Sequence, residues 1–139
     1  MHLLDTDTWT HLQRGHPRVV QARQAVTDPA VHVSIVTWIE VIRGRCEALL
    51  KAANASEFQR AQTNLSRDRE LLEEWDAVPV NERSTAIFDQ LRTIKGLKKI
   101  GRGDLLIASI ALAHNAVLVT RNLRHFSQVP QLRLVNWVD

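Results

Sequence analysis

The stretch GDLLIASIALAHNAVLVT, residues 103–120, decides the fold class of this 139-residue chain. Its first part, Gly103–Asn115, is apolar on nearly every side, which predicts a buried helix. Its second part, Ala116–Thr120, is rich in β-branched residues and has the length of a strand. A buried helix followed at once by a buried strand is typical of an α/β protein with a parallel sheet.

Short β-type runs alternate with helical patterns along the whole chain. Strands are expected at Met1–Leu4, Val31–Val36, Ala77–Val80, Ala116–Thr120 and Leu132–Val135. Helices are expected at Pro17–Val26, Thr37–Leu50, Ala53–Trp75, Asn81–Lys95 and Gly103–Asn115. Thr37 is the expected N-cap of its helix. We therefore expect a three-layer α/β/α sandwich with a mostly parallel central sheet, formed by residues 1–139 as a single domain.

The bulk composition excludes several classes of protein. No apolar run reaches the length of about 18 residues that a membrane span needs, so no membrane association is expected. The N-terminus lacks a basic region followed by a long apolar stretch, which argues against a signal peptide. The single Cys46 cannot form an internal disulfide and fits a cytoplasmic protein. The net charge of +3 is compatible with a polyanionic partner without requiring one.

Three carboxylates lie at the edges of apolar elements. Asp5 ends the first apolar run, Glu40 lies about one helical turn past the second strand, and Asp104 opens the buried helix. An ionised carboxylate near an apolar core is costly unless it is paired or binds a metal. Open α/β sheets form their sites beyond the carboxyl ends of the strands, so these acids and Asn122 are expected to share one pocket. A hard cation such as Mg²⁺ would neutralise that pocket.

Each acid also has a purely structural interpretation. Asp5 could cap the helix that follows it. Glu40 could form an ion pair with Arg43 or Arg45. Asp104 could be an ordinary acid in the first turn of a helix, where the helix dipole favours a negative charge.

Five segments occur in a fixed order along the chain: Leu3–Asp7, Ser34–Gly44, Gly103–Ser109, Leu118–Asn122, and Phe126 to Trp137. Together they resemble the motifs of PIN-domain ribonucleases, specifically the VapC-type toxins of VapBC toxin–antitoxin pairs. The resemblance implies an endoribonuclease that depends on Mg²⁺ or Mn²⁺, often cuts tRNA, is silenced by a small antitoxin and forms a homodimer. By position it makes Asp5, Glu40 and Asp104 the metal-binding acids, with Asn122 completing the catalytic set.

The chain departs from the family pattern at the fourth acid. Many relatives have an acid just before the residue that matches Phe126, where this chain has His125, or an Asp in place of Asn122. Asn122 still offers a neutral oxygen, and Asp7 offers another carboxylate. The departure leaves open a PIN fold that only binds RNA or a protein.

A second alternative is a phosphatase of the haloacid-dehalogenase type. Its Asp-x-Asp opening resembles Asp5 and Asp7, which would then be the phosphorylated nucleophile and the acid/base. That family needs a second Asp four residues after Asp104, and Ala108 stands there.

Two surfaces are expected beside the acids. The basic segment from Lys95 to Arg102 could hold RNA phosphates or form a solvated loop. An apolar groove for an antitoxin helix is expected along Thr37–Leu50 and Ala53–Trp75, with a basic antitoxin side chain reaching the acids. The residues expected to line it are Trp38, Leu49, Leu50, Phe58 and Leu65.

Overall fold

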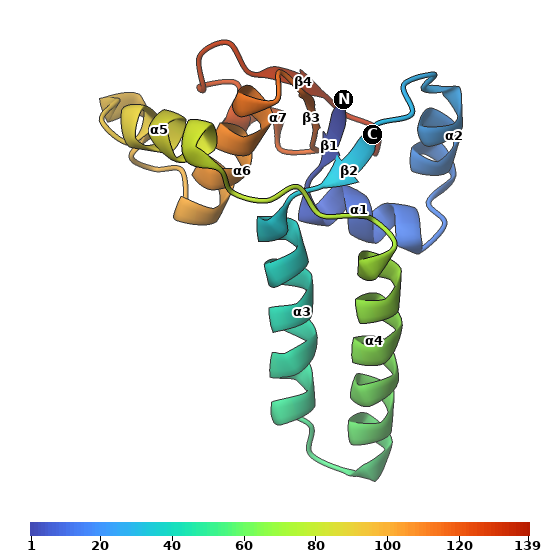
Figure 1. Cartoon of the computed structure of the whole chain (residues 1–139). Coiled ribbons are helices and arrows are strands. Elements are labelled where there is room, and N and C mark those ends of the chain that lie inside the picture. The colour runs from blue at the N-terminus through green and yellow to red at the C-terminus, as the bar shows by residue number, and fades with distance from the viewer.

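A four-stranded parallel sheet lies at the centre of this computed structural model, which describes all 139 residues (Figure 1). The strands are β1 (His2–Leu4), β2 (Val31–Val33), β3 (Val117–Val119) and β4 (Arg133–Val135), in the order β2-β1-β3-β4. The α-helices are α1 (Thr6–Gln13), α2 (Pro17–Ala25), α3 (Ile35–Leu50), α4 (Ala55–Glu73), α5 (Glu82–Leu91), α6 (Arg102–Ala113) and α7 (Leu123–Phe126). A 3-10 turn, η1 (Lys95–Leu97), precedes α6.

Helices cover both faces of the sheet, and neighbouring residues of β1 show this. Leu3 belongs to a buried cluster with residues of α5, α6 and α7, including Ile107 and Phe126. Leu4 points to the opposite face and packs with residues of α1 to α4, including Trp9 and Leu72. The expected three-layer α/β/α sandwich is therefore confirmed.

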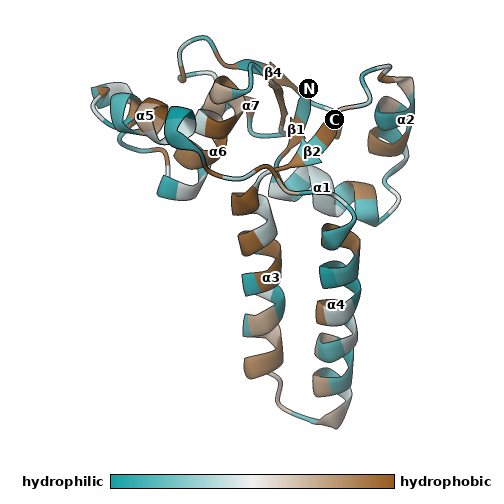
Figure 2. Ribbon diagram, viewed as in Figure 1, coloured by the Kyte–Doolittle hydropathy of each residue, from teal (hydrophilic) through white to brown (hydrophobic).

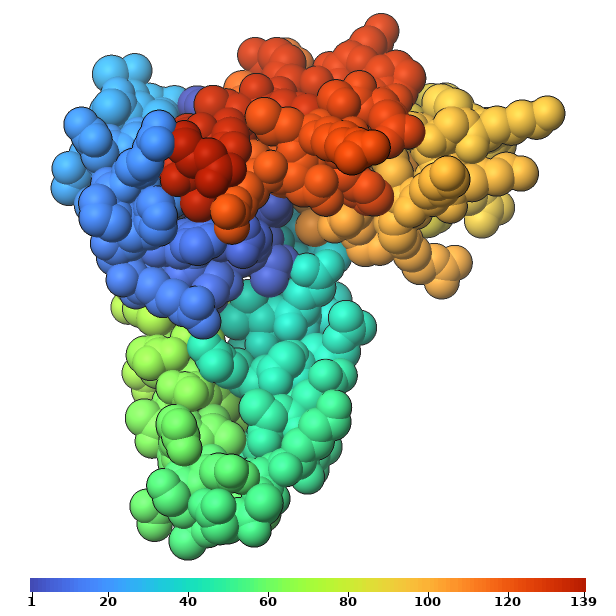
Figure 3. Space-filling view, turned by 180° about the vertical axis from the view of Figure 1, so that it is seen from behind, coloured from blue at the N-terminus to red at the C-terminus, as the bar shows by residue number.

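Helices α3 and α4 form a long antiparallel hairpin that extends from the sheet (Figure 1). Helix α3 is the more apolar of the two, whereas α4 is mostly hydrophilic (Figure 2). The Asp68 side chain on α4 is buried between them, where Arg45 Nε donates to it at 2.6 Å and Arg67 Nε at 3.3 Å. Seen from behind, the hairpin is a separate lobe below the sheet layers (Figure 3). None of the helices combines the length and apolar character needed to cross a membrane.

The second strand is shorter than the predicted Val31–Val36. It ends at Val33 because Ser34 caps α3, and the Ser34 hydroxyl accepts a hydrogen bond from Thr37 N at 3.2 Å. The prediction that Thr37 is the N-cap was therefore wrong. A capping hydroxyl satisfies a backbone donor at the helix start, and here it outweighs the β preference of the two residues that follow.

Two other predicted elements differ in the structure. Ala77–Val80 is not a strand, since only Val78 forms a bridge, with Ser34. Pro79 lacks the backbone N–H that further pairing would use. The predicted helix Asn81–Lys95 is shorter at both ends: α5 starts after the N-cap Asn81, stops at Leu91, and is followed by the separate turn η1.

Candidate active site

A cavity of about 450 Å³ opens beyond the carboxyl ends of β1 and β3. Strand β1 has β2 on one side and β3 on the other, so the strand order reverses here, as it does where open α/β sheets bind ligands. The cavity is lined by Asp5, Thr6, Asp7, Glu40, Asp104, Ile107, Arg121, Asn122 and Phe126. All four residues expected at the site, Asp5, Glu40, Asp104 and Asn122, lie around this one cavity.

Asp5 is held rigidly at the junction of β1 and α1. Its backbone N–H donates to the Val119 carbonyl at 3.0 Å, and its Oδ1 accepts from Thr8 N at 2.8 Å as the N-cap of α1. The Asp5 side chain therefore caps α1 and lines the cavity at the same time. Burial raises the pKa of Asp5, although hydrogen bonds from Thr120 and Thr8 lower it in part.

Glu40 extends from the second turn of α3 toward α1 and α6. Thr6 Oγ1 donates to Glu40 Oε2 at 2.5 Å. Gly103 of α6 leaves room for the other oxygen, because a Cβ at that position would lie 3.0 Å from Glu40 Oε1. The alternative ion pair of Glu40 with Arg43 or Arg45 is not formed, and Arg45 binds Asp68 instead.

Asp104 is the third residue of α6, and its half-buried carboxyl faces the cavity. Burial raises its pKa, His125 lowers it, and the negative charges of Glu40 and Asp5 raise it further. His125 Nε2 lies 3.4 Å from Asp104 Oδ2. The three acids therefore lie close enough to repel one another, and the cavity holds negative charge that the protein compensates only in part.

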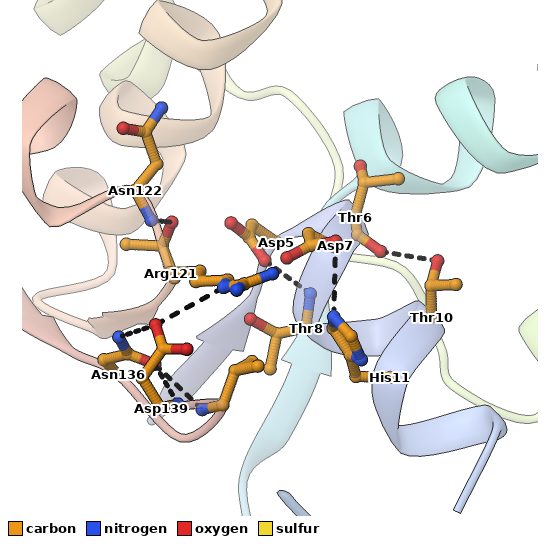
Figure 4. Close-up of polar contacts among 12 residues, drawn as sticks. Asp5, Thr6, Asp7, Thr8, Thr10, His11, Arg121, Asn122, Asn136 and Asp139 are labelled. Carbon is orange, nitrogen blue, oxygen red and sulfur yellow. Dashed lines mark hydrogen bonds and ion pairs between the residues drawn. The ribbon is translucent and has the colours of Figure 1, made fainter. Parts of the chain in front are cut away.

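Asn122 and Asp7 lie at the edge of the cavity and are both exposed. The backbone N–H of Asn122 donates to Thr120 Oγ1 at 3.0 Å, and its amide points away from Asp5 (Figure 4). Asp7 Oδ1 lies 3.6 Å from His11 Nε2. Neither residue is buried beside the three acids.

The geometry limits how a metal ion could be held. No three His, Cys, Asp or Glu side chains are close enough together to hold one ion in common. The side chains around the cavity nevertheless offer carboxylate, hydroxyl and amide oxygens, which are the donors that Mg²⁺ prefers. Mg²⁺ usually keeps several of its waters, so an ion bound partly through water fits this spacing.

Sequence reasoning assigned no role to Thr6 or Arg121, which both line the cavity. Thr6 directly follows Asp5, and Arg121 lies two residues past the end of β3. The sequence did indicate a role for both residues through their positions just beyond strand ends, because an open α/β sheet forms its site there.

Comparisons with known proteins agree with this geometry. A family model described as PIN domain matches residues 2–132. Ribonuclease VapC2 of Rickettsia felis is 39% identical over 85 residues, which cover 59% of this chain and 63% of that protein. The crystal structure of VapBC2 from Rickettsia felis, bound to a DNA fragment from its promoter, has a TM-score of 0.76 at 26% identity and 98% coverage of both chains. The structure of VapBC-1 from nontypeable Haemophilus influenzae has a TM-score of 0.77 at 26% identity, and the match covers 99% of this chain and 98% of that one.

Proposed function

The chain belongs to the PIN-domain family, and from this premise we propose that it is a metal-dependent endoribonuclease, the toxin of a type II toxin–antitoxin pair. Its substrate is RNA, with tRNA the first class to test, and the reaction is hydrolysis of a phosphodiester bond. The observation that carries the proposal is the convergence of Asp5, Glu40 and Asp104 on one cavity from three distant parts of the chain. The similarity to a ribonuclease VapC and to VapBC structures supports it.

The cavity suits Mg²⁺, with Mn²⁺ as a substitute. Asp5, Glu40 and Asp104 would hold the ion at least partly through its waters. Burial is the main cause of the raised pKa values of Asp5 and Asp104, so their ionised forms are costly, and a bound cation would offset that cost. When bound, such an ion supplies an activated water and neutralises the phosphate oxygens.

The protein's own residues prepare this chemistry by fixing the acids in place. Thr6 orients Glu40 through its hydroxyl, and the cap of α1 orients Asp5. Ile107 and Phe126 are the two buried apolar side chains that line the cavity beside the acids. Because the acids are already in position before the substrate arrives, the site does not need to reorganise during the reaction. This preorganisation is usually the largest contribution to the rate at such sites.

The direct test is cleavage of unfractionated tRNA by the purified protein in Mg²⁺, in Mn²⁺ and in EDTA. We expect cleavage with either metal and none in EDTA. Asp104→Asn should lower the cleavage rate by about 100-fold or more, because the charge is lost while the shape remains. Circular dichroism of the variant should match the wild type.

Three results would contradict the proposal. Cleavage that persists in purified Asp104→Asn protein would remove Asp104 from the reaction. Hydrolysis of a small phosphomonoester such as p-nitrophenyl phosphate, without RNA cleavage, would support the phosphatase alternative. Tight RNA binding without cleavage would support the alternative of a PIN fold that only binds.

A second cavity, beside the first, supports the antitoxin as partner. It measures about 680 Å³, lies between α1, α3 and α4, and shares Thr6 and Glu40 with the acid cavity. Its lining includes Trp9, Arg14, Arg45, Asn64, Arg67 and Leu71. The lining of this second cavity is mainly polar and contains none of the residues expected to line an apolar groove, so this cavity is not the predicted groove.

An antitoxin tail bound in this second cavity would reach the acids within a short distance, and a basic side chain on it would replace the cation's charge. The test is cleavage by the complex with an antitoxin encoded next to the toxin gene. Removal of the antitoxin's basic tail should restore cleavage. Inhibition that survives this truncation would exclude blocking through the acids.

A further inference from the structure

Arg121 is the one basic side chain that lines the acid cavity. It lies two residues beyond β3, and about half of its side chain is exposed. Its ion-pair partner is Asp139, with Arg121 Nε 3.3 Å from Asp139 Oδ2, and none of the cavity's acids lies within ion-pair distance. Figure 4 shows the guanidinium group between Asp139 on one side and Asp5 and Asp7 on the other.

Asp139 is held in place by the segment that follows β4. Asn136 Nδ2 donates to Asp139 Oδ2 at 3.0 Å, and Asn136 Oδ1 accepts from the backbone N–H groups of Val138 and Asp139 at 2.8 and 3.2 Å. Val138 and Trp137 are buried, which fixes this turn against the body of the protein. Figure 3 shows the C-terminal segment lying against the N-terminal part of the chain.

This arrangement leaves most of the guanidinium free. An arginine carries five N–H donors in a planar fork, and the contact with Asp139 engages only Nε. If Arg121 served only to neutralise the acids, it would pair with them, whereas its partner is a residue outside the cavity. A fork that is anchored at one end and open at the other matches the oxygens of a phosphate.

We propose that Arg121 binds a phosphate of the RNA substrate at the acid cavity and that Asp139 is a positioning residue that orients Arg121. This inference rests on the proposed function, since it names the contact by which the same site holds RNA. The acids alone repel an RNA backbone, so a cation at the cavity edge gives the substrate a fixed point beside them. Asp139 acts on the substrate only through Arg121.

The test measures binding of unfractionated tRNA and of a short fluorescein-labelled single-stranded RNA. All variants carry Asp104→Asn, so that cleavage does not consume the probe. Arg121→Ala should weaken binding by about 10- to 100-fold, the usual effect of losing a charge-assisted hydrogen-bonded contact. On the single-stranded probe it should also reduce the slope of log affinity against log salt by about 0.7, the value for one phosphate contact.

The chain contains a closely matched control. Arg92 Nε lies 3.4 Å from Asp89 Oδ1 on α5, both side chains are exposed, and neither lines the acid cavity. Arg92→Ala removes the same charge and the same kind of ion pair. We expect it to change RNA affinity by less than about threefold, since no local phosphate contact is lost.

Two further variants separate contact from positioning. Arg121→Lys keeps the charge but loses the fork, so the salt slope should stay while the affinity falls. Asp139→Asn should weaken binding in the presence of Arg121 and have no effect in the Arg121→Ala background. A merely structural role of Asp139 would give the same loss in both backgrounds. If Arg121→Ala does not fold, Arg121→Lys carries the test, because it keeps the charge and removes only the fork.

The outcomes distinguish this inference from the proposed function. If the wild type cleaves RNA and Arg121→Ala equals Arg92→Ala in affinity and salt slope, the inference is overturned and the nuclease stands. If the wild type cleaves no RNA but binds it through Arg121, the contact stands and the nuclease proposal fails.

Discussion

At the scale of single residues, Asp5 has two roles that usually belong to different side chains. It caps α1 through Thr8 N, and it lies almost fully buried in the cavity, with 8% of its surface exposed. The cap fixes its position, and the burial raises its pKa. An ionised Asp5 therefore costs folding free energy whenever no cation is bound.

This cost predicts a pH-dependent effect of Asp5→Asn. Because the pKa of Asp5 is higher in the folded than in the unfolded state, the folded state binds the proton more tightly, and ionisation destabilises the fold above that pKa. Asn keeps the capping oxygen. In EDTA at neutral pH, the variant should therefore gain about 1.4 kcal/mol in free energy of unfolding per unit of pKa shift. The gain should disappear as the pH falls through the raised pKa toward the ordinary value.

Urea unfolding at several pH values in EDTA measures this effect, and the same series in Mg²⁺ is the control. A bound cation compensates the charge of Asp5, so the gain should shrink in Mg²⁺. A variant that is less stable than the wild type at neutral pH in EDTA would show that the charge is already compensated within the protein.

The acids were predictable from sequence, and the basic residues around them were not. Asp5 ends one apolar run and Asp104 opens another, and carboxylates at such positions are rare enough to be noticed. Arg121 stands in an ordinary polar turn, and its partner Asp139 is brought to it only by the pairing of β3 with β4. Asp68 was equally hidden, because a buried acid in α4 has the same local sequence as a solvated helix face.

At the scale of elements, the position of α6 against α3 depends on the missing side chain of Gly103. Alanine is favoured over glycine in helices by about 1 kcal/mol, so Gly103→Ala should not lower stability by much. Its Cβ would nevertheless lie 3.0 Å from Glu40 Oε1 and displace that carboxylate. We expect the variant to cleave RNA about 10-fold or more slowly, since small displacements at such sites are costly.

Gly44→Ala on α3 is the matched control for this effect. Outside its own stretch of helix, no atom lies within 4 Å of a Cβ built there, so the variant should gain helix stability and retain its rate of RNA cleavage. Thermal unfolding and tRNA cleavage measure both quantities. Equal cleavage rates of the two glycine variants would mean that Glu40 tolerates the crowding.

The predicted boundaries of secondary-structure elements were wrong where one polar side chain outweighed the hydrophobic pattern of the sequence. The run Val31–Val36 has strand composition throughout, yet Ser34 and the backbone bonds of Val33 and Ile35 to Val78 end the strand. Which hydroxyl caps a helix depends on where the chain leaves the sheet, and a local pattern does not contain this information. The parallel sheet itself followed from the alternation of elements, which no single residue controls.

At the scale of the whole molecule, the α3–α4 hairpin exposes apolar side chains that the sheet layers do not cover. Leu50 is 84% exposed and Phe58 47%. We expect this lobe to take part in a homodimer, so Leu50→Glu combined with Phe58→Glu should shift the protein from dimer to monomer in light scattering. Surface changes of this kind usually alter stability by less than about 0.5 kcal/mol, so the fold should survive.

The control for the dimer is Ile94→Glu, which places the same charge at an exposed apolar residue outside the hairpin. It should leave the mass unchanged. A wild-type protein that is monomeric at micromolar concentration would contradict the expectation directly.

The order of the sheet also has a consequence for the synthesis of the chain. Strand β1 and Asp5 are made first, but β1 lies between β2 and β3, and β3 is translated only after α6 and Asp104. A chain still emerging from the ribosome therefore holds its acids apart, without the neighbours that would bring them together. The acids of the proposed nuclease come together only after β3 has been translated, so until then the ribosome's own RNA is next to a chain without an assembled acid cavity.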